Sequence, residues 1–176
     1  MDVYIRPMTT DDVPQVLRLE ADAFPEDPAT DFDKELANRL ACYLVACYKE
    51  QNSPQGAEHI VGYCGTWLVI DESHLLSIAV RREHRRKGVG ELLLIAALED
   101  VIAGGAQSMF LEVRVSNSSA RALYEKYGFV RLGLRREYYR DNNEDAVVMR
   151  AEGLDQSSYK ETLAVRKGQV RDKYHG

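Results

Sequence analysis

A basic segment that contains two glycines separates a strand-like apolar stretch from a long helix-like one, and it reads Arg85-Arg86-Lys87-Gly88-Val89-Gly90. Glycine permits positive φ angles and lets a ligand approach the backbone closely. The helix that begins here offers unpaired N–H groups and the positive end of its dipole. Such a junction suits a phosphate or pyrophosphate, although a solvated basic turn before an ordinary helix would give the same pattern. Neither the Walker pattern nor the Rossmann GxGxxG is present.

The hydrophobic periodicity predicts a mixed α/β sheet flanked by helices. The first helix begins at Thr10 and is ended by Pro25 and Pro28, because proline opposes helical geometry. A polar stretch at residues 51–58 indicates an exposed hairpin loop. In chain order the pattern gives a strand, two helices, three strands, a helix, a strand, a helix and two strands. The strands are expected at 3–5, 42–48, 60–70, 75–80, 109–115, 130–139 and 146–151, and the later helices at 32–40, 88–103 and 117–127.

Length and composition favour one domain in the cytoplasm. The chain has 176 residues and a formal net charge of −5, which argues against a broad nucleic-acid footprint. We expect a domain at residues 1–152 and a flexible, charged tail at 153–176 that packs weakly or is disordered. The N-terminus lacks the order of a signal peptide, and no run of 18 apolar residues suggests a membrane span. Three cysteines form no CxxC pair, and the histidines show no ligand spacing, so no metal is expected.

The glycine segment belongs to a wider resemblance. Its Arg-x-x-Gly-x-Gly spacing resembles the pyrophosphate loop of the GNAT acetyltransferase superfamily. Residues 111–129, which include Leu111-Glu112-Val113-Arg114 and Tyr124-Glu125-Lys126-Tyr127-Gly128-Phe129, and residues 138–149 carry the same likeness. Together these blocks resemble the ribosomal-protein-alanine N-acetyltransferases (RimI type) and their archaeal N-terminal acetyltransferase relatives. The resemblance runs from about Ile5 to Met149 and is most specific in the C-terminal half.

The resemblance implies the GNAT fold, a largely antiparallel seven-stranded sheet with about four helices. It also implies acetyl-CoA as the acyl donor, and the N-terminal α-amine of a protein, most simply a ribosomal protein that begins with alanine, as the acceptor. No membrane or direct nucleic-acid partner is expected. The implied cofactor-binding residues are Ile78, Ala79, Val80, Arg85, Arg86, Lys87, Gly88, Val89, Gly90, Asn117 and Tyr124, and the implied substrate-binding residues are Phe24, Glu112, Tyr138 and Tyr139.

Two residues match the family's acid–base positions. Glu112 lies on the polar side of an alternating strand, where a half-exposed ion pair would be the ordinary role; the resemblance makes it a general base acting through water. Tyr124 could simply pack in a helix, as its neighbour Tyr127 would, but the resemblance makes it the general acid. An α-amine has a reference pKa near 7.7–8.0, so part of it is already neutral at physiological pH.

One departure concerns the loop after Phe24. Relatives often place an apolar pair there, whereas this chain has acids on the loop and just beyond it, at Glu26, Asp27, Asp31 and Asp33. These acids could favour a basic peptide or form a solvated face.

Other functions stay open at this point. They are a GNAT enzyme acting on a small amine such as a polyamine, aminoglycoside or amino acid, a noncatalytic acyl-CoA-binding module, and a nucleic-acid-binding module built on residues 81–87.

Overall fold

The computed structural model describes residues 2–50 and 57–175, so most of the expected hairpin loop at 51–58 lies outside the described residues. Within them, seven strands form one sheet in the order β1-β2-β3-β4-β5-β7-β6. Neighbouring strands are antiparallel except for the parallel pair β4 and β5. The expected mixed, largely antiparallel α/β fold is therefore confirmed. The strands are β1 (Tyr4–Pro7), β2 (Ala41–Lys49), β3 (Glu58–Val69), β4 (Glu72–Val80), β5 (Ser108–Arg114), β6 (Val130–Tyr139) and β7 (Glu144–Glu152).

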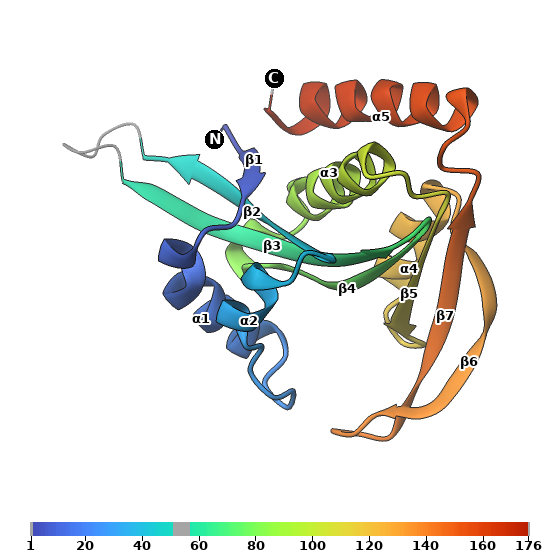
Figure 1. Cartoon of the computed structure of the whole chain (residues 1–176). Coiled ribbons are helices and arrows are strands. Elements are labelled where there is room, and N and C mark those ends of the chain that lie inside the picture. Colours follow the sequence, from blue (N-terminus) through green and yellow to red (C-terminus); the bar gives the residue numbers. More distant parts are fainter. Residues whose placement is uncertain (1, 51–56, 176) are drawn as a thin grey trace.

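Helices cover both faces of the sheet (Figure 1). Helices α1 and α2 lie on one face of β2–β4, and α3 lies on the other face with α5 above it. A short 3₁₀ turn, capped by Thr9 rather than Thr10, precedes α1, and α2 ends before Leu40, because Asn38 takes an extended conformation that leads the chain into β2. The helices are α1 (Val13–Ala23), α2 (Phe32–Ala37), α3 (Val89–Ala103), α4 (Ser118–Lys126) and α5 (Ser157–His175), with 3₁₀ turns at Thr10–Asp12 and Arg82–His84.

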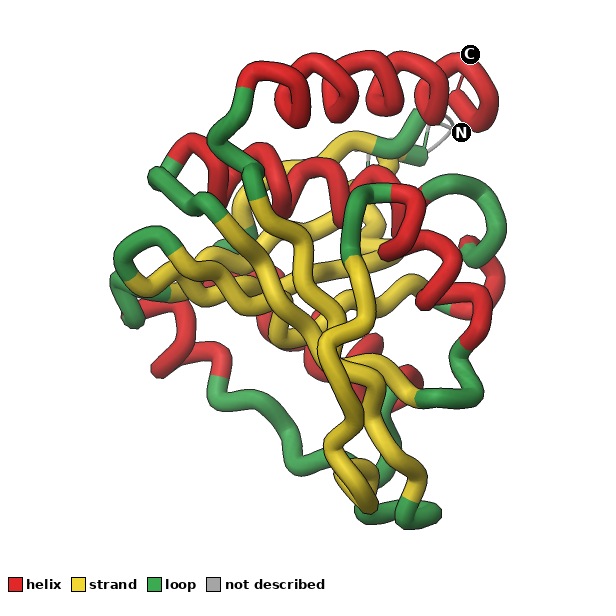
Figure 2. Tube along the Cα trace, turned by 90° about the vertical axis from the view of Figure 1, so that its right-hand side faces the viewer, coloured by secondary structure: helices red, strands yellow, loops and turns green. Residues whose placement is uncertain are grey.

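The pairing between β4 and β5 is short. It joins only Glu72, Ser73 and His74 of β4 to residues 108–110 of β5. Beyond this point β4 continues along β3 and β5 continues along β7. The two groups of strands therefore run in different directions across the molecule (Figure 2), and the sheet opens at the split.

Helix α3 is buried nearly all round. Its buried side chains include four consecutive residues, Leu92 to Ile95, as well as Val89 and Val101. A helix that is apolar on every side must be covered on every side. The sheet covers its inner face, and α5 covers its outer face (Figure 1).

The C-terminal segment differs from the flexible tail that the composition suggested. Residues 157–175 form α5, and Leu163 and Val170 are only 4% and 3% exposed. The Tyr159 hydroxyl donates to the Tyr127 carbonyl at 2.7 Å, and Lys167 pairs with Glu99 at 2.7 Å. Two apolar residues seven positions apart lie on one face of a helix, so a sparse apolar pattern was enough to dock it. No helix among the described residues is long and apolar enough to cross a membrane.

The docking of α5 predicts a clear stability effect. Leu163→Ala should lower the free energy of unfolding by about 2–4 kcal/mol, since it removes buried methyl groups and leaves a cavity. Urea unfolding measures the change. The matched control is Val165→Ala on the same helix, where the side chain is 61% exposed and the expected change is within about 0.5 kcal/mol. Equal values for the two variants would show that α5 does not pack on the core.

Candidate active site

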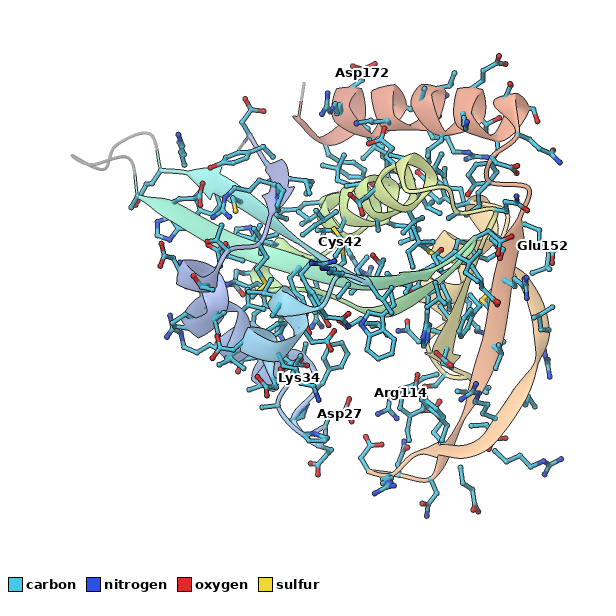
Figure 3. All side chains as sticks on the ribbon, in the orientation of Figure 1. Asp27, Lys34, Cys42, Arg114, Glu152 and Asp172 are labelled. Carbon is cyan, nitrogen blue, oxygen red and sulfur yellow. The ribbon has the colours of Figure 1, made fainter. Side chains whose placement is uncertain are left out.

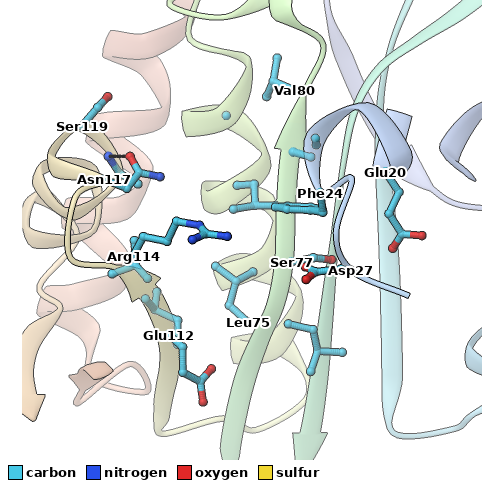
Figure 4. Close-up of a pocket in the computed structure, with 18 of the residues that line it drawn as sticks. Glu20, Phe24, Asp27, Leu75, Ser77, Val80, Glu112, Arg114, Asn117 and Ser119 are labelled. Atoms are coloured by element: carbon cyan, nitrogen blue, oxygen red, sulfur yellow. Dashed lines mark hydrogen bonds between the residues drawn. The ribbon is translucent and has the colours of Figure 1, made fainter. Parts of the chain in front are cut away.

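A cavity of about 1260 Å³ lies where β4 and β5 separate. The edge of β4 from Leu75 to Val80 forms one side, and residues 111–114 of β5 form the other (Figure 4). The loop after α1, the start of α3, the start of α4 and the β6–β7 turn complete the walls. Segments that are far apart in the chain therefore form the walls of one cavity.

The β4 wall offers an unoccupied strand edge. Residues 75–80 pair with β3 on one side, while pairing with β5 has already ended at His74. Ile78, Ala79 and Val80, all predicted to bind the cofactor, line the cavity. Exposed backbone N–H and C=O groups in extended geometry can pair with the amides of a linear ligand.

The glycine segment, residues 85–90, follows β4 and lines the cavity next along the chain. Gly88 caps α3 with φ +77°, a left-handed conformation that favours glycine. Gly88 and Gly90 line the cavity together with Arg85 and Arg86. The free N–H groups of the first turn of α3 and these two cations suit a phosphate group. Two predicted cofactor residues are not among the lining side chains: Lys87 is exposed, and the Val89 side chain is buried in the core.

Two basic residues, His74 on β4 and Arg135 on β6, contact the carboxylate of Glu112. Its carboxylate lines the cavity, and its side chain is 7% exposed. His74 Nε2 lies 2.7 Å from Glu112 Oε2, and Arg135 Nη2 lies 3.6 Å from Oε1. Burial raises the pKa of Glu112, but the hydrogen bond from His74 and the charges of His74 and Arg135 outweigh burial and lower it. The cavity therefore contains an ionised carboxylate.

His74 was not singled out from the sequence. It pairs with Phe110 across the short β4–β5 ladder, and the two rings stack with centroids 4.1 Å apart. Glu112 is two residues further along β5, so its side chain lies on the same face as Phe110. No local signal links His74 to a carboxylate 38 positions away. The register of one strand pair creates the contact.

Tyr124 is a second titratable residue in the cavity, and its surroundings favour the protonated form. It lines the cavity from α4, is 6% exposed and packs against Phe129. Burial raises the pKa of its phenol, and the nearby Tyr139 and Cys64 add to the effect. The hydroxyl accordingly keeps its proton. Asn117, which also lines the cavity, accepts a hydrogen bond from the Ala120 amide at 3.1 Å and caps α4 as the sequence predicted.

The aromatic residues predicted to bind substrate come from the end of α1 and the end of β6. Phe24, Tyr138 and Tyr139 line the cavity, and the rings of the two tyrosines meet edge to face at 5.0 Å. The Arg114 guanidinium lies 3.9 Å above the Tyr139 ring, and it projects from β5 into the cavity (Figure 4). Burial raises the pKa of Tyr139 to about 12.

Carboxylates hold parts of the cavity wall in place. Arg114 pairs with Asp141 at 2.9 Å and with Glu144 at 3.4 Å, which joins β5 to the turn between β6 and β7. On the opposite wall, Glu20 accepts hydrogen bonds from Thr30 and from the Tyr63 hydroxyl. In the sequence, Glu20 stands at a position of α1 where the helical periodicity places apolar residues, and this was the signal that the acid has a structural role. Residues that line the cavity therefore also brace its two walls.

The acidic residues of the α1–α2 region fall into two groups. Glu26 and Asp27 line the cavity, and Asp27 lies across the opening from Arg114 (Figure 3). Asp31 instead caps α2 by accepting from the Lys34 amide, and Asp33 is exposed on that helix.

The cysteines are unsuited to nucleophilic chemistry. Burial raises the pKa of Cys42 and of Cys47 to about 12, and it raises the pKa of Cys64 as well. A thiol reacts as its thiolate, and none of the three lines the cavity. In the described part of the chain, no group of three or more His, Cys, Asp or Glu side chains is placed to hold a metal ion.

Comparison with known proteins identifies the class. The sequence model of the acetyltransferase (GNAT) family matches residues 13–129, and the chain belongs to this family. It is an acetyltransferase, similar in particular to enzymes that acetylate protein N-termini. The ribosomal protein bS18-alanine N-acetyltransferase of Escherichia coli (strain K12) is 35% identical over 149 residues, which cover 82% of this chain and 94% of that protein. An N-alpha-acetyltransferase of Sulfurisphaera tokodaii is 34% identical over 163 residues, covering 84% of this chain and 91% of that one.

Solved structures agree on the fold. The crystal structure of the ribosomal-protein-S18-alanine N-acetyltransferase from Escherichia coli has a TM-score of 0.70 and 30% sequence identity, and the match covers 86% of this chain and 94% of that one. Arabidopsis thaliana NAA60 in complex with acetyl-CoA has a TM-score of 0.75 at 14% identity, covering 85% and 98%. The second likeness supports the fold alone.

The Glu112–His74 contact predicts a measurable shift. His74→Ala should raise the pKa of the Glu112 carboxyl, because the hydrogen bond and the charge that lower it are lost while burial remains. A pH titration followed by carbon-13 NMR of labelled glutamate carboxyls measures it. The matched control is His59→Ala, which removes an exposed histidine that contacts Glu50 and should leave Glu112 unchanged. An unchanged Glu112 pKa in His74→Ala would contradict the assigned contact.

Proposed function

We propose that this enzyme transfers the acetyl group of acetyl-CoA to the N-terminal α-amine of a protein, with a ribosomal protein that begins with alanine as the leading substrate. The observation that carries the proposal is the placement of an ionised Glu112 and a protonated Tyr124 in one cavity, beside the free edge of β4. The names of the relatives supply the acceptor class.

The residues present fit acetyl-CoA. The free β4 edge at 75–80 can pair with the amides of the pantetheine arm. The first turn of α3, with Arg85 and Arg86, can hold the pyrophosphate. Glu112 and Tyr124 line the same cavity and would be the acid–base groups available to the acyl thioester.

Glu112 receives the proton that the amine loses. As the new C–N bond forms, the amine nitrogen becomes positive and must release a proton. A carboxylate of low pKa is a weak base, but an α-amine is easily made neutral, with a reference pKa of about 7.7–8.0. The carboxylate can act through water.

Tyr124 returns a proton to the sulfur. When the C–S bond breaks, the electron pair stays on the thiolate. A buried phenol that keeps its own proton at neutral pH can donate it there. The Tyr124 hydroxyl has no hydrogen-bond partner among the described residues, so it is available to a ligand. Direct attack by the amine is the proposed route, and the raised pKa values of the three thiols and their position off the cavity support it.

The aromatic end suits a peptide. Phe24, Tyr138 and Tyr139 form a rim at the substrate entrance, and Glu26 and Asp27 give this rim a negative charge. A positively charged α-amine, or a basic side chain close behind it, is attracted to such a rim.

Peptides that share one sequence but differ in the first residue test the proposal. We expect acetyl-CoA turnover on free N-termini, highest with alanine first, and none on the same peptide with a blocked N-terminus and an internal lysine. Mass spectrometry locates the added acetyl group. Turnover with spermidine or an aminoglycoside, and none with any free peptide N-terminus, would assign the enzyme to small amines instead.

Variants of the acid–base pair test the mechanism. Glu112→Gln should lower kcat/KM by about 10²–10⁴-fold, and the loss should shrink at high pH, where more of the amine is neutral. Tyr124→Phe should lower kcat without that relief, because it removes a proton donor rather than a base. Glu112→Gln should keep the affinity for CoA measured by calorimetry.

The matched control for the acid is Tyr127→Phe, on a residue that does not line the cavity and whose hydroxyl contacts Glu91. It should keep wild-type turnover. Wild-type rates in Tyr124→Phe would remove this phenol from the mechanism, and an acetylated cysteine that passes its acetyl group to peptide would exclude direct attack.

A further inference from the structure

Helix α5 lies beyond the part of the chain that the family model matches, residues 13–129. Its last turn nevertheless reaches the candidate active site. Tyr174 lines the same cavity as Gly88, Gly90 and Glu91 at the start of α3. A helix outside the matched segment therefore contributes a side chain to the cavity that the phosphate loop, residues 85–90, also lines.

The contact with the phosphate loop is close. A Cβ atom built on Gly88 would lie 2.5 Å from Tyr174 Cδ2 and 2.9 Å from Cγ. The ring therefore packs directly on the backbone of the residue that caps α3. The free N–H groups of α3 begin immediately after Gly88. A phosphate held by these N–H groups would therefore lie next to the Tyr174 ring.

The rest of α5 fixes the ring in place. Leu163 and Val170 are buried on one face of the helix, and Tyr159 donates to the Tyr127 carbonyl at 2.7 Å. Tyr127 in turn donates to Glu91 in the first turn of α3 at 2.7 Å. Helix α5 is therefore anchored to the core, to the end of α4 and, through Tyr127, to the first turn of α3.

One cation lies close to the ring, and two others line the same cavity. Lys173 Nζ lies 4.9 Å from the centre of the Tyr174 ring, and Arg85 and Arg86 are lining residues, as is the acid Glu91. An aromatic surface next to several positive charges suits a phosphorylated nucleotide, which combines a planar base with anionic phosphates.

We propose that Tyr174 is a cofactor-binding residue and that α5 serves to deliver it. Its ring forms a wall of the site for the phosphorylated nucleotide portion of CoA, opposite the N–H groups of α3. The proposal rests on the function proposed above for the coenzyme, and it adds a binding residue that the loop motif does not contain.

Calorimetry with CoA tests the proposal in the full chain. Tyr174→Ala should weaken CoA binding about tenfold, the loss expected for one aromatic contact. Tyr174→Glu should weaken it further, because a carboxylate would face the phosphates. The matched control is Val165→Glu, which adds the same charge at an exposed position of the same helix and should bind CoA as the wild type does.

A second ligand and a melting experiment show whether a loss of affinity comes from the missing Tyr174 contact or from a folding defect. Adenosine 3′,5′-bisphosphate, the nucleotide fragment of CoA, should lose affinity for Tyr174→Ala by a similar factor, while the ligand-free variant should keep the wild-type melting temperature. Wild-type affinity for CoA in both Tyr174 variants would overturn this inference and leave the proposed function intact. A wild-type chain that binds no CoA would contradict both.

Discussion

The short pairing between β4 and β5 is the constraint on which the site depends. Three residues of each strand pair, and the sheet then divides into two groups of strands. A backbone edge left without a partner inside a folded domain needs another source of hydrogen bonds. The split supplies both the opening for a linear ligand and the unsatisfied groups that such a ligand can pair with. Glu112 lies just beyond the last paired residues of β5, so the site sits at the point where pairing ends.

Helix α3 connects the split to the rest of the molecule. Its first turn faces the cavity, and its body is the centre of the core. Because it is apolar on every side, it needs a layer outside the sheet, and α5 provides that layer. The same packing carries Tyr174 to the loop before α3. The need to cover α3 thus also places Tyr174 in the lining of the cavity, beside Gly88.

Two titratable groups acquire opposite roles from their surroundings. The hydrogen bond from His74 on β4 and the charge of Arg135 on β6 help to keep Glu112 ionised although its side chain is only 7% exposed. Burial, with the nearby Tyr139 and Cys64, keeps Tyr124 protonated. Pairs of groups whose environments drive their pKa values apart are well placed for acid–base chemistry. In this cavity the neighbours of each group add to the difference: His74 and Arg135 lie beside Glu112, whereas Tyr139 and Cys64 raise the pKa of Tyr124.

Local chemistry determined much of this protein from sequence alone. Alternating and helical periodicities located most strands and helices, glycine located the left-handed turn at the start of α3, and Asn117 located a helix start. Tertiary structure alone decided three things: that His74 contacts Glu112 across one strand register, that Arg114 joins β5 to the β6–β7 turn, and that the charged C-terminal segment docks as α5. Periodicity and capping act over a few residues and are visible in the sequence. Contacts between distant segments depend on register and packing, which exist only once the chain has folded.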